Sequence, residues 1–245
     1  MIVNHIPEGW EVIYQPAHAL LAARLIAHWR IDQRPARWIE TLVALAQHDD
    51  EATEWAGRNH LTDVGAPQDF TLSLAPSLAQ PEMVTQDLQY KGQWATLLIS
   101  MHMCFLYDHL RADGAEYAAF LDSQHAYQKE VRTSLKLSKK EADAAYALFQ
   151  WADALSLILC RRQLPEGGRA LEVSAGPDGT RYDVIDQAGV VTVRPWPFQE
   201  EAFTVTVETF PLTQLKFKDD AELQHALHQT PVTELSWDFK RTSGT

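Results

Sequence analysis

The chain has 245 residues, of which 46% are hydrophobic and 22% are charged, enough apolar material for one large domain or for a main domain and a smaller one. Its 33 acidic and 21 basic residues give a formal net charge of −12, which argues against a phosphate-neutralising surface, so we expect no nucleic-acid partner. The N-terminal MIVNHIPEGWEV lacks the basic and apolar regions of a signal peptide, and no apolar run is long enough for a membrane span, so we expect a cytoplasmic protein with no membrane partner.

Helical patterns dominate the chain up to Pro165. After a possible short strand in GWEVIYQ, apolar residues recur three and four positions apart, which is typical of amphipathic helices. Pro16 suits the first turn of a helix, and Ser138 with Glu141 forms a capping-box pattern. The spacing predicts helices over about 16–30, 35–48, 94–110, 115–134 and 138–160, with a long irregular connection over 59–80.

Beyond Pro165, β-branched and aromatic residues alternate between Gly, Pro and Asp turns, which indicates short strands. The expected strands are RALEVSA, TRYDVID, GVVTVRP, AFTVTVETF and VTELSWDF, with one helix near DDAELQHALHQ. We therefore predict a mainly α protein, in which a helical bundle over residues 1–162 carries a small antiparallel β-rich subdomain over 163–245, α+β overall. The subdomain could cover the mouth of an active site, pair between subunits or be purely structural.

Ionisable residues occupy several positions where the helical pattern demands apolar ones. His18 begins the inward stripe of the first helix, and Asp49 continues that of the second, with His48 beside it. His102 lies in the nearly all-apolar helix, and Asp153 lies among inward positions of the last one. Taken singly, each histidine could be a core residue, the His48-Asp49 doublet could mark a helix end, and Asp153 could pair with an arginine such as Arg24.

A divalent cation would explain the set as a whole. Burying a carboxylate without a partner costs several kcal/mol. A cation would offset the charges of Asp49 and Asp153 and use the neutral imidazoles as well. Mixed His and Asp ligands suit a transition metal such as Fe, Mn or Zn better than Ca or Mg. The sequence therefore predicts a metal site for one or two ions.

The order His18, His48-Asp49, His102 and Asp153 resembles the HD-domain superfamily of helical, metal-dependent phosphohydrolases. The phrases RWIETLVALAQHDD, LLISMHMCFL, QWADALSLILC and PWPF also resemble the domain-of-unknown-function 3891 family, which brings no activity with it. The HD resemblance implies an HD-like bundle in which His18, His48, Asp49 and Asp153 ligate a first metal. It implies that His102 is the best match for a ligand of a second ion, with His109 or His125 weaker. Superfamily members commonly follow the doublet with an apolar residue, Gly and Lys, but Asp50-Glu51-Ala52 stands here.

Three functions remain open at this stage. The first is a metal-dependent hydrolase of a small, phosphorylated substrate. In it Asp49 bridges ions or orients the nucleophile, Asp50 or Glu51 acts as general base, and Arg24, Arg58 or Arg161 recognises phosphate. The second is a di-iron oxygenase on the same scaffold, favoured by His102 and by the missing phosphate-binding Lys. The third is a binding or regulatory protein that has lost catalysis.

Overall fold

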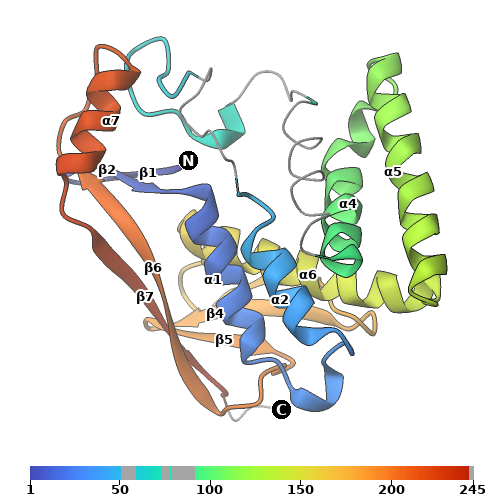
Figure 1. Ribbon diagram of the computed structural model, residues 1–245. Coiled ribbons are helices and arrows are strands. Elements are labelled where there is room, and N and C mark those ends of the chain that lie inside the picture. Colours follow the sequence, from blue (N-terminus) through green and yellow to red (C-terminus); the bar gives the residue numbers. More distant parts are fainter. Residues whose placement is uncertain (51–58, 73–77, 79–91, 243–245) are drawn as a thin grey trace.

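Figure 1 shows a computed structural model of the chain, which describes residues 1–50, 59–72, 78 and 92–242. Within these residues, helices and strands are mixed along the chain. A β-hairpin precedes the first helix, and the last helix lies between the last two strands. In the described part of the chain, no helix is both long and apolar enough to cross a bilayer.

The helices expected from apolar spacing are confirmed, with ends that differ by a few residues. Pro16 lies in the first turn of its helix, and the Ser138–Glu141 capping box forms at the start of another. The helices are α1 (Gln15–Ala27), α2 (Trp38–Ala46), α4 (Gln93–Tyr107), α5 (Ala115–Ser134), α6 (Lys139–Cys160) and α7 (Asp220–Gln229), with short 3₁₀ turns at Ile31–Gln33, Phe70–Leu72 and Asp108–Leu110.

Seven strands in the described residues form one mixed sheet in the order β1-β2-β6-β7-β5-β4-β3. Neighbours are antiparallel except β5 and β7, which run parallel. The strands are β1 (Ile2–Ile6), β2 (Gly9–Ile13), β3 (Ala170–Ala175), β4 (Arg181–Gln187), β5 (Val190–Arg194), β6 (Ala202–Leu212) and β7 (Thr233–Lys240).

This sheet shows that the expected mainly α bundle is wrong: the fold is α+β. Residues 2–13 form a hairpin rather than one short strand, and β2 pairs with β6 from the other end of the chain. Gly9 permits this approach, because a side chain there would collide with the carbonyl of Leu212. The pairing is non-local, so a change of composition near Pro165 could not reveal it. The sheet thus crosses the predicted boundary at 162/163, while the division into domains stays a prediction.

The helices are layered outward from the sheet. α1 contacts β6 and α6, α2 contacts α1 and α4, and α4 contacts α5, an order visible from left to right in Figure 1. One hydrophobic core joins these helices to β4, β5, β6 and β7, and a smaller one lies beneath α7. The largest fully buried side chains of the larger core include Trp29, Trp151, Phe149 and Phe239. Burial of these aromatic side chains fixes α1 and α6 relative to each other and to the sheet.

Candidate metal centre

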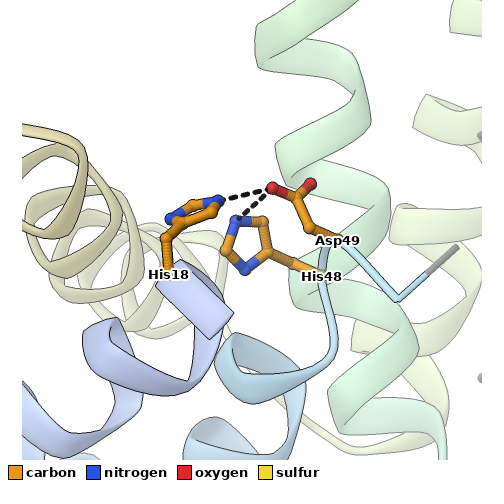
Figure 2. Close-up of side chains that lie close together, drawn as sticks. All are labelled: His18, His48 and Asp49. Carbon is orange, nitrogen blue, oxygen red and sulfur yellow. Dashed lines mark hydrogen bonds and ion pairs between the residues drawn. The ribbon is translucent and has the colours of Figure 1, made fainter. Parts of the chain in front are cut away.

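The doublet His48-Asp49 lies just beyond the end of α2. The helix ends at Ala46, and the backbone of Gln47 has left the helical region with φ −123° and ψ 8°. Adjacent residues on a regular helix point about 100° apart, whereas this ending allows both side chains to face the same place. Nε2 of His48 lies 3.6 Å from Oδ2 of Asp49. The end of the helix therefore positions two neighbouring residues at one site, as Figure 2 shows.

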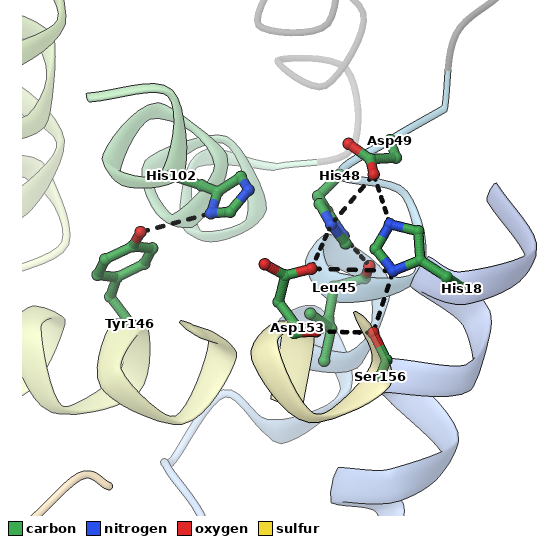
Figure 3. Close-up of polar contacts among 8 residues, drawn as sticks. All are labelled: His18, Leu45, His48, Asp49, His102, Tyr146, Asp153 and Ser156. Carbon is green, nitrogen blue, oxygen red and sulfur yellow. Dashed lines mark hydrogen bonds and ion pairs between the residues drawn. The ribbon is translucent and has the colours of Figure 1, made fainter. Parts of the chain in front are cut away.

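His18 reaches the same site from the first turn of α1. Its Nε2 lies 2.6 Å from Oδ2 of Asp49, and its side chain is 1% exposed. Asp153 approaches from α6 and places Oδ1 3.1 Å from Nε2 of His48. Three segments that are far apart in the sequence thus bring two imidazoles and two carboxylates together, as drawn in Figure 3.

The partner of His48 decides which of its ring nitrogens carries the proton. Nδ1 lies 2.7 Å from the carbonyl oxygen of Leu45, one turn back in α2. A carbonyl oxygen can only accept, so Nδ1 carries the hydrogen and donates it. In the neutral imidazole, Nε2 therefore keeps its lone pair and directs it toward the two carboxylates. The backbone of α2 thus fixes His48 in the tautomer that a metal ligand needs.

Ser156 fixes His18 in the same way. Its hydroxyl donates to the backbone carbonyl of Asp153 over 2.8 Å, one turn earlier in α6. The Ser156 oxygen is then free to accept from Nδ1 of His18, which lies 3.0 Å away. Nε2 of His18 is left with its lone pair facing Asp49.

Four acceptor atoms therefore lie close together around His48: its own Nε2, Oδ2 of Asp49 with Nε2 of His18 beside it, and Oδ1 of Asp153. His18, His48 and Asp49 form one group within 4.8 Å, and Asp153 joins them through its contact with His48. Lone pairs at such distances repel one another unless a proton or a cation lies among them. The imidazole nitrogens and carboxylate oxygens are ligands that divalent transition metals accept. The chemistry of this set therefore fits a metal ion, although nothing in it identifies which metal.

A second group overlaps the first. His102 of α4 joins His48 and Asp153 in a buried set whose ligand atoms lie within 4.8 Å of one another. The first set, His18, His48 and Asp49, meets the same limit. On the side away from His48, Nδ1 of His102 lies 3.4 Å from the hydroxyl of Tyr146 on α6. His48 is therefore common to both groups.

The charges of the site are strongly coupled. Burial alone would lower the pKa of His48, but the Asp49 and Asp153 carboxylates outweigh it and raise this pKa to about 9. Burial would raise the pKa values of Asp49 and Asp153, yet the neighbouring imidazoles, His48 above all, hold both below their usual range. Burial lowers the pKa of His102 to about 4 and raises that of Tyr146. Without a metal, a proton on His48 takes the place of the cation.

The structure brings together all five residues predicted as metal ligands, namely His18, His48, Asp49, His102 and Asp153. Asp50, predicted as catalytic, is exposed and follows Asp49 in the chain, whereas Glu51 and Arg58 lie outside the described residues. Neither of the other two arginines considered for phosphate is directed to this site by its contacts. Arg24 donates to the carbonyl of Thr206, and Arg161 lies over the ring of Phe70.

Sequence reasoning missed two neighbours of the ligands, Ser156 and Tyr146. Both lie on α6 at helical spacing from Asp153, Ser156 three positions after it and Tyr146 seven before it. That spacing was the available signal, because it places all three near one face of the helix. A serine within an apolar helix and a tyrosine on its inward stripe nevertheless have no sequence feature that separates them from ordinary core residues.

A comparison with known families decides the relationship of the chain. Residues 1–214 match the model of a family described as "Protein of unknown function (DUF3891)". The chain belongs to this family. Neither the curated proteins nor the solved structures gave a match. The resemblance to the DUF3891 family is thereby confirmed, and because its description names no activity, a function has to be argued from the metal centre.

Proposed function

We propose that this DUF3891 protein is a metal-dependent hydrolase of a phosphate ester and that His18, His48, Asp49 and Asp153 hold its divalent transition metal. The observation that carries the proposal is the convergence of four acceptor atoms, of which the two imidazole nitrogens are fixed as lone-pair donors by Leu45 and Ser156. In the metal-free protein a proton on His48 lies among these acceptors, and a metal ion bound there would replace it.

The differing burial of the ligands indicates from which side a substrate enters. The side chains of His18 and His48 are each 1% exposed, that of Asp153 is 12% exposed and that of Asp49 is 18% exposed. Solvent therefore reaches the centre beside Asp49, and the exposed Asp50 lies next to it along the chain. A bound divalent ion would lower the pKa of a coordinated water toward ~7 and polarise a phosphoryl oxygen. In this proposal Asp49 would orient that water, and Asp50, which follows it in the chain, would accept its proton.

The phosphate ester is supported by the order of the ligands along the chain. His18, His48-Asp49 and Asp153 follow one another in the order of the HD-domain superfamily, and each of the other three contacts the His48 site directly or through Asp49. The acidic Asp50-Glu51 in place of the superfamily's Gly and Lys removes one expected phosphate contact. A phosphodiester or a monoester of low charge fits such a site better than a polyphosphate does, because it brings fewer negative charges to a site that lacks this Lys.

A di-iron oxygenase is the second candidate, because His102, His48 and Asp153 form a further ligand group. The hydrogen bond from Nδ1 of His48 to Leu45 leaves this imidazole with one lone pair, and one lone pair binds one ion. Two ions therefore cannot both be bound by three ligands each, because His48 can ligate only one of them. The single lone pair of His48 favours a site for one ion. A di-iron oxygenase needs two ions, so the hydrolase is favoured.

A substrate panel tests the hydrolase. Protein loaded with Mn²⁺, Zn²⁺ or Fe²⁺ would be incubated at high concentration with phosphomonoesters, phosphodiesters and nucleotides. We expect hydrolysis that depends on the metal, is lost in Asp49→Ala and is kept in Asp113→Ala, where the replaced carboxylate is exposed. Metal-loaded protein that leaves the whole panel intact would refute the hydrolase, and oxygen uptake by the iron form would then favour the oxygenase.

A further inference from the structure

His102 differs from the other two histidines of the centre in the partner of its outer nitrogen. His48 donates to a carbonyl, and His18 donates to a serine oxygen whose hydrogen is already used. The partner of Nδ1 of His102 is the phenol of Tyr146, 3.4 Å away. A phenol donates a hydrogen bond more readily than it accepts one, since its oxygen lone pair is delocalised into the ring. The contacts of His102 therefore do not impose the tautomer that the other two histidines have.

The position of the phenolic hydrogen decides between two states of His102. If His102 ligates through Nε2, then Nδ1 carries the hydrogen and the Tyr146 oxygen must accept it. The phenolic hydrogen of Tyr146 is then left without an acceptor among the described residues. If instead Tyr146 donates to Nδ1, both groups are satisfied, and the hydrogen of His102 resides on Nε2. Hydrogen bonding therefore favours the Nε2–H form.

The ring of His102 is held so that its second nitrogen faces the metal centre. Figure 3 shows Nδ1 turned to Tyr146 and the opposite nitrogen turned toward His48. The ring contacts Phe149, at a centroid distance of 5.2 Å, and Phe105, at 6.3 Å. His102 is 2% exposed, and within the described residues Nε2 has no hydrogen-bond partner. Phe105 is 54% exposed, so solvent lies just beyond this side of the ring.

We propose that His102, held as the Nε2–H tautomer by Tyr146, is a hydrogen-bond donor to a phosphoryl oxygen of the substrate rather than a metal ligand. The inference rests on the proposed hydrolase and names a catalytic residue and its positioning residue for it. The Nε2–H of His102 would stabilise the negative charge that builds up on the phosphoryl oxygens during hydrolysis. In the HD-domain superfamily the Lys that is missing here contributes to this stabilisation.

Nitrogen NMR of the histidine side chains tests the tautomer directly. We would label histidine with ¹⁵N and record the two ring-nitrogen shifts of His102 with and without Zn²⁺, assigned by comparison with His102→Gln. The expected result is an unprotonated Nδ1 and a protonated Nε2 in both states. In Tyr146→Phe this preference should be lost, and it should persist in Tyr117→Phe. A zinc-coordinated Nε2, or a hydrogen on Nδ1 in the metal-free protein, would overturn the inference.

Phosphate binding tests the donor role without turnover. Calorimetry on zinc-loaded protein should show inorganic phosphate binding about tenfold or more weakly to His102→Ala than to wild type, with an unchanged zinc stoichiometry. Tyr146→Phe should show a smaller loss, because it affects the donor only through its tautomer. Loss of zinc from His102→Ala, or unchanged phosphate affinity, would overturn the inference. Absence of zinc binding in wild type would instead refute the proposed function, and the tautomer of the metal-free protein would still decide the state of His102.

Discussion

At the scale of single residues, the candidate centre depends on atoms that bear no charge. The carbonyl of Leu45 and the hydroxyl of Ser156 never contact the proposed ion, yet they decide that His48 and His18 present lone pairs to it. Such outer partners commonly matter for affinity nearly as much as the ligands themselves do. Ser156 is fully buried and is a side chain, so it can be removed by mutation, whereas the Leu45 carbonyl cannot.

We therefore expect Ser156→Ala to weaken metal binding by roughly 10–100-fold without abolishing it. The imidazole of His18 loses the acceptor that holds the hydrogen on Nδ1, so part of the population presents the wrong nitrogen. Competition against a fluorescent chelator would measure the change. Ser123→Ala is the matched control, since Ser123 lies on α5 and bonds to its own helix. Equal affinity in both variants would contradict the role of Ser156.

The raised pKa of His48 predicts how the metal-free protein responds to pH. The pKa of His48 is about 9 in the folded protein and about 6.5 in the unfolded chain. Protonation of His48 therefore stabilises the fold fully below pH 6.5, and this contribution is lost as the pH rises through about 9. The loss is on the order of 3 kcal/mol. Urea unfolding with chelator present, at pH 6.5 and 9.5, would measure it, and His48→Gln should flatten the difference. A free energy of unfolding that rises over this interval would contradict the charge pattern of the centre.

At the scale of elements, the metal centre arises from where helices begin and end. Of the four proposed ligands, His18 lies in the first turn of α1, His48-Asp49 lie just beyond the end of α2, and only Asp153 comes from the middle of a helix, α6. The capping box of α6 is well formed, with Ser138 and Glu141 bonded in both directions. This cap stabilises a helix that carries Tyr146, Asp153 and Ser156.

Ser138→Ala should lower the free energy of unfolding by about 1 kcal/mol, because the amide of Glu141 then loses its capping acceptor. Denaturant unfolding would measure this change. Thr133→Ala, also exposed and near a helix end, should change stability by less. The metal stoichiometry should stay the same in both variants, since the cap lies several turns from Asp153. A loss of metal with unchanged stability would show that the cap acts on the site in another way.

The helices and the clustering of the candidate ligands were predictable from the sequence for related reasons. Apolar spacing locates a helix, and the same spacing exposes a polar residue that interrupts it, which is how His18, Asp49 and Asp153 were recognised. Ser156 and Tyr146 interrupt no pattern, so only their contacts distinguish them. The hairpin of residues 2–13 was missed because two five-residue strands are too short for a clear alternation. In addition, the residues of β6 that pair with β2 lie about 200 positions away along the chain.

At the scale of the whole molecule, the C-terminal strands belong to the same core as the helices of the metal centre. Phe198 of the PWPF segment packs against Trp29 and Trp151, and the backbone of Gln199 donates to the carbonyl of His28. These contacts lie at the opposite end of α1 from His18. These contacts favour the hypothesis that the C-terminal segment is purely structural over the hypothesis that it covers the mouth of an active site.

A fragment ending at residue 162 should therefore fail to fold cooperatively. Removing 163–245 takes away the partner of β2 and uncovers Trp29 and Trp151, which are fully buried in the complete chain. Exposure of so much apolar surface forfeits several kcal/mol, comparable to the whole stability of a small domain. Solubility, near-UV circular dichroism and thermal unfolding would measure the effect. A soluble fragment with a sharp transition and bound metal would instead support the predicted boundary at 162/163.

The most direct test of the account is the metal content of the purified protein by elemental mass spectrometry. Wild type, His48→Ala and Asp49→Ala would be compared, with His125→Ala as control, because His125 is exposed on α5. We expect one equivalent of iron, manganese or zinc in wild type and in the control, and almost none in the two ligand variants. Wild-type protein that holds no metal even after reconstitution, while all variants fold normally, would contradict the metal centre and with it the proposed function.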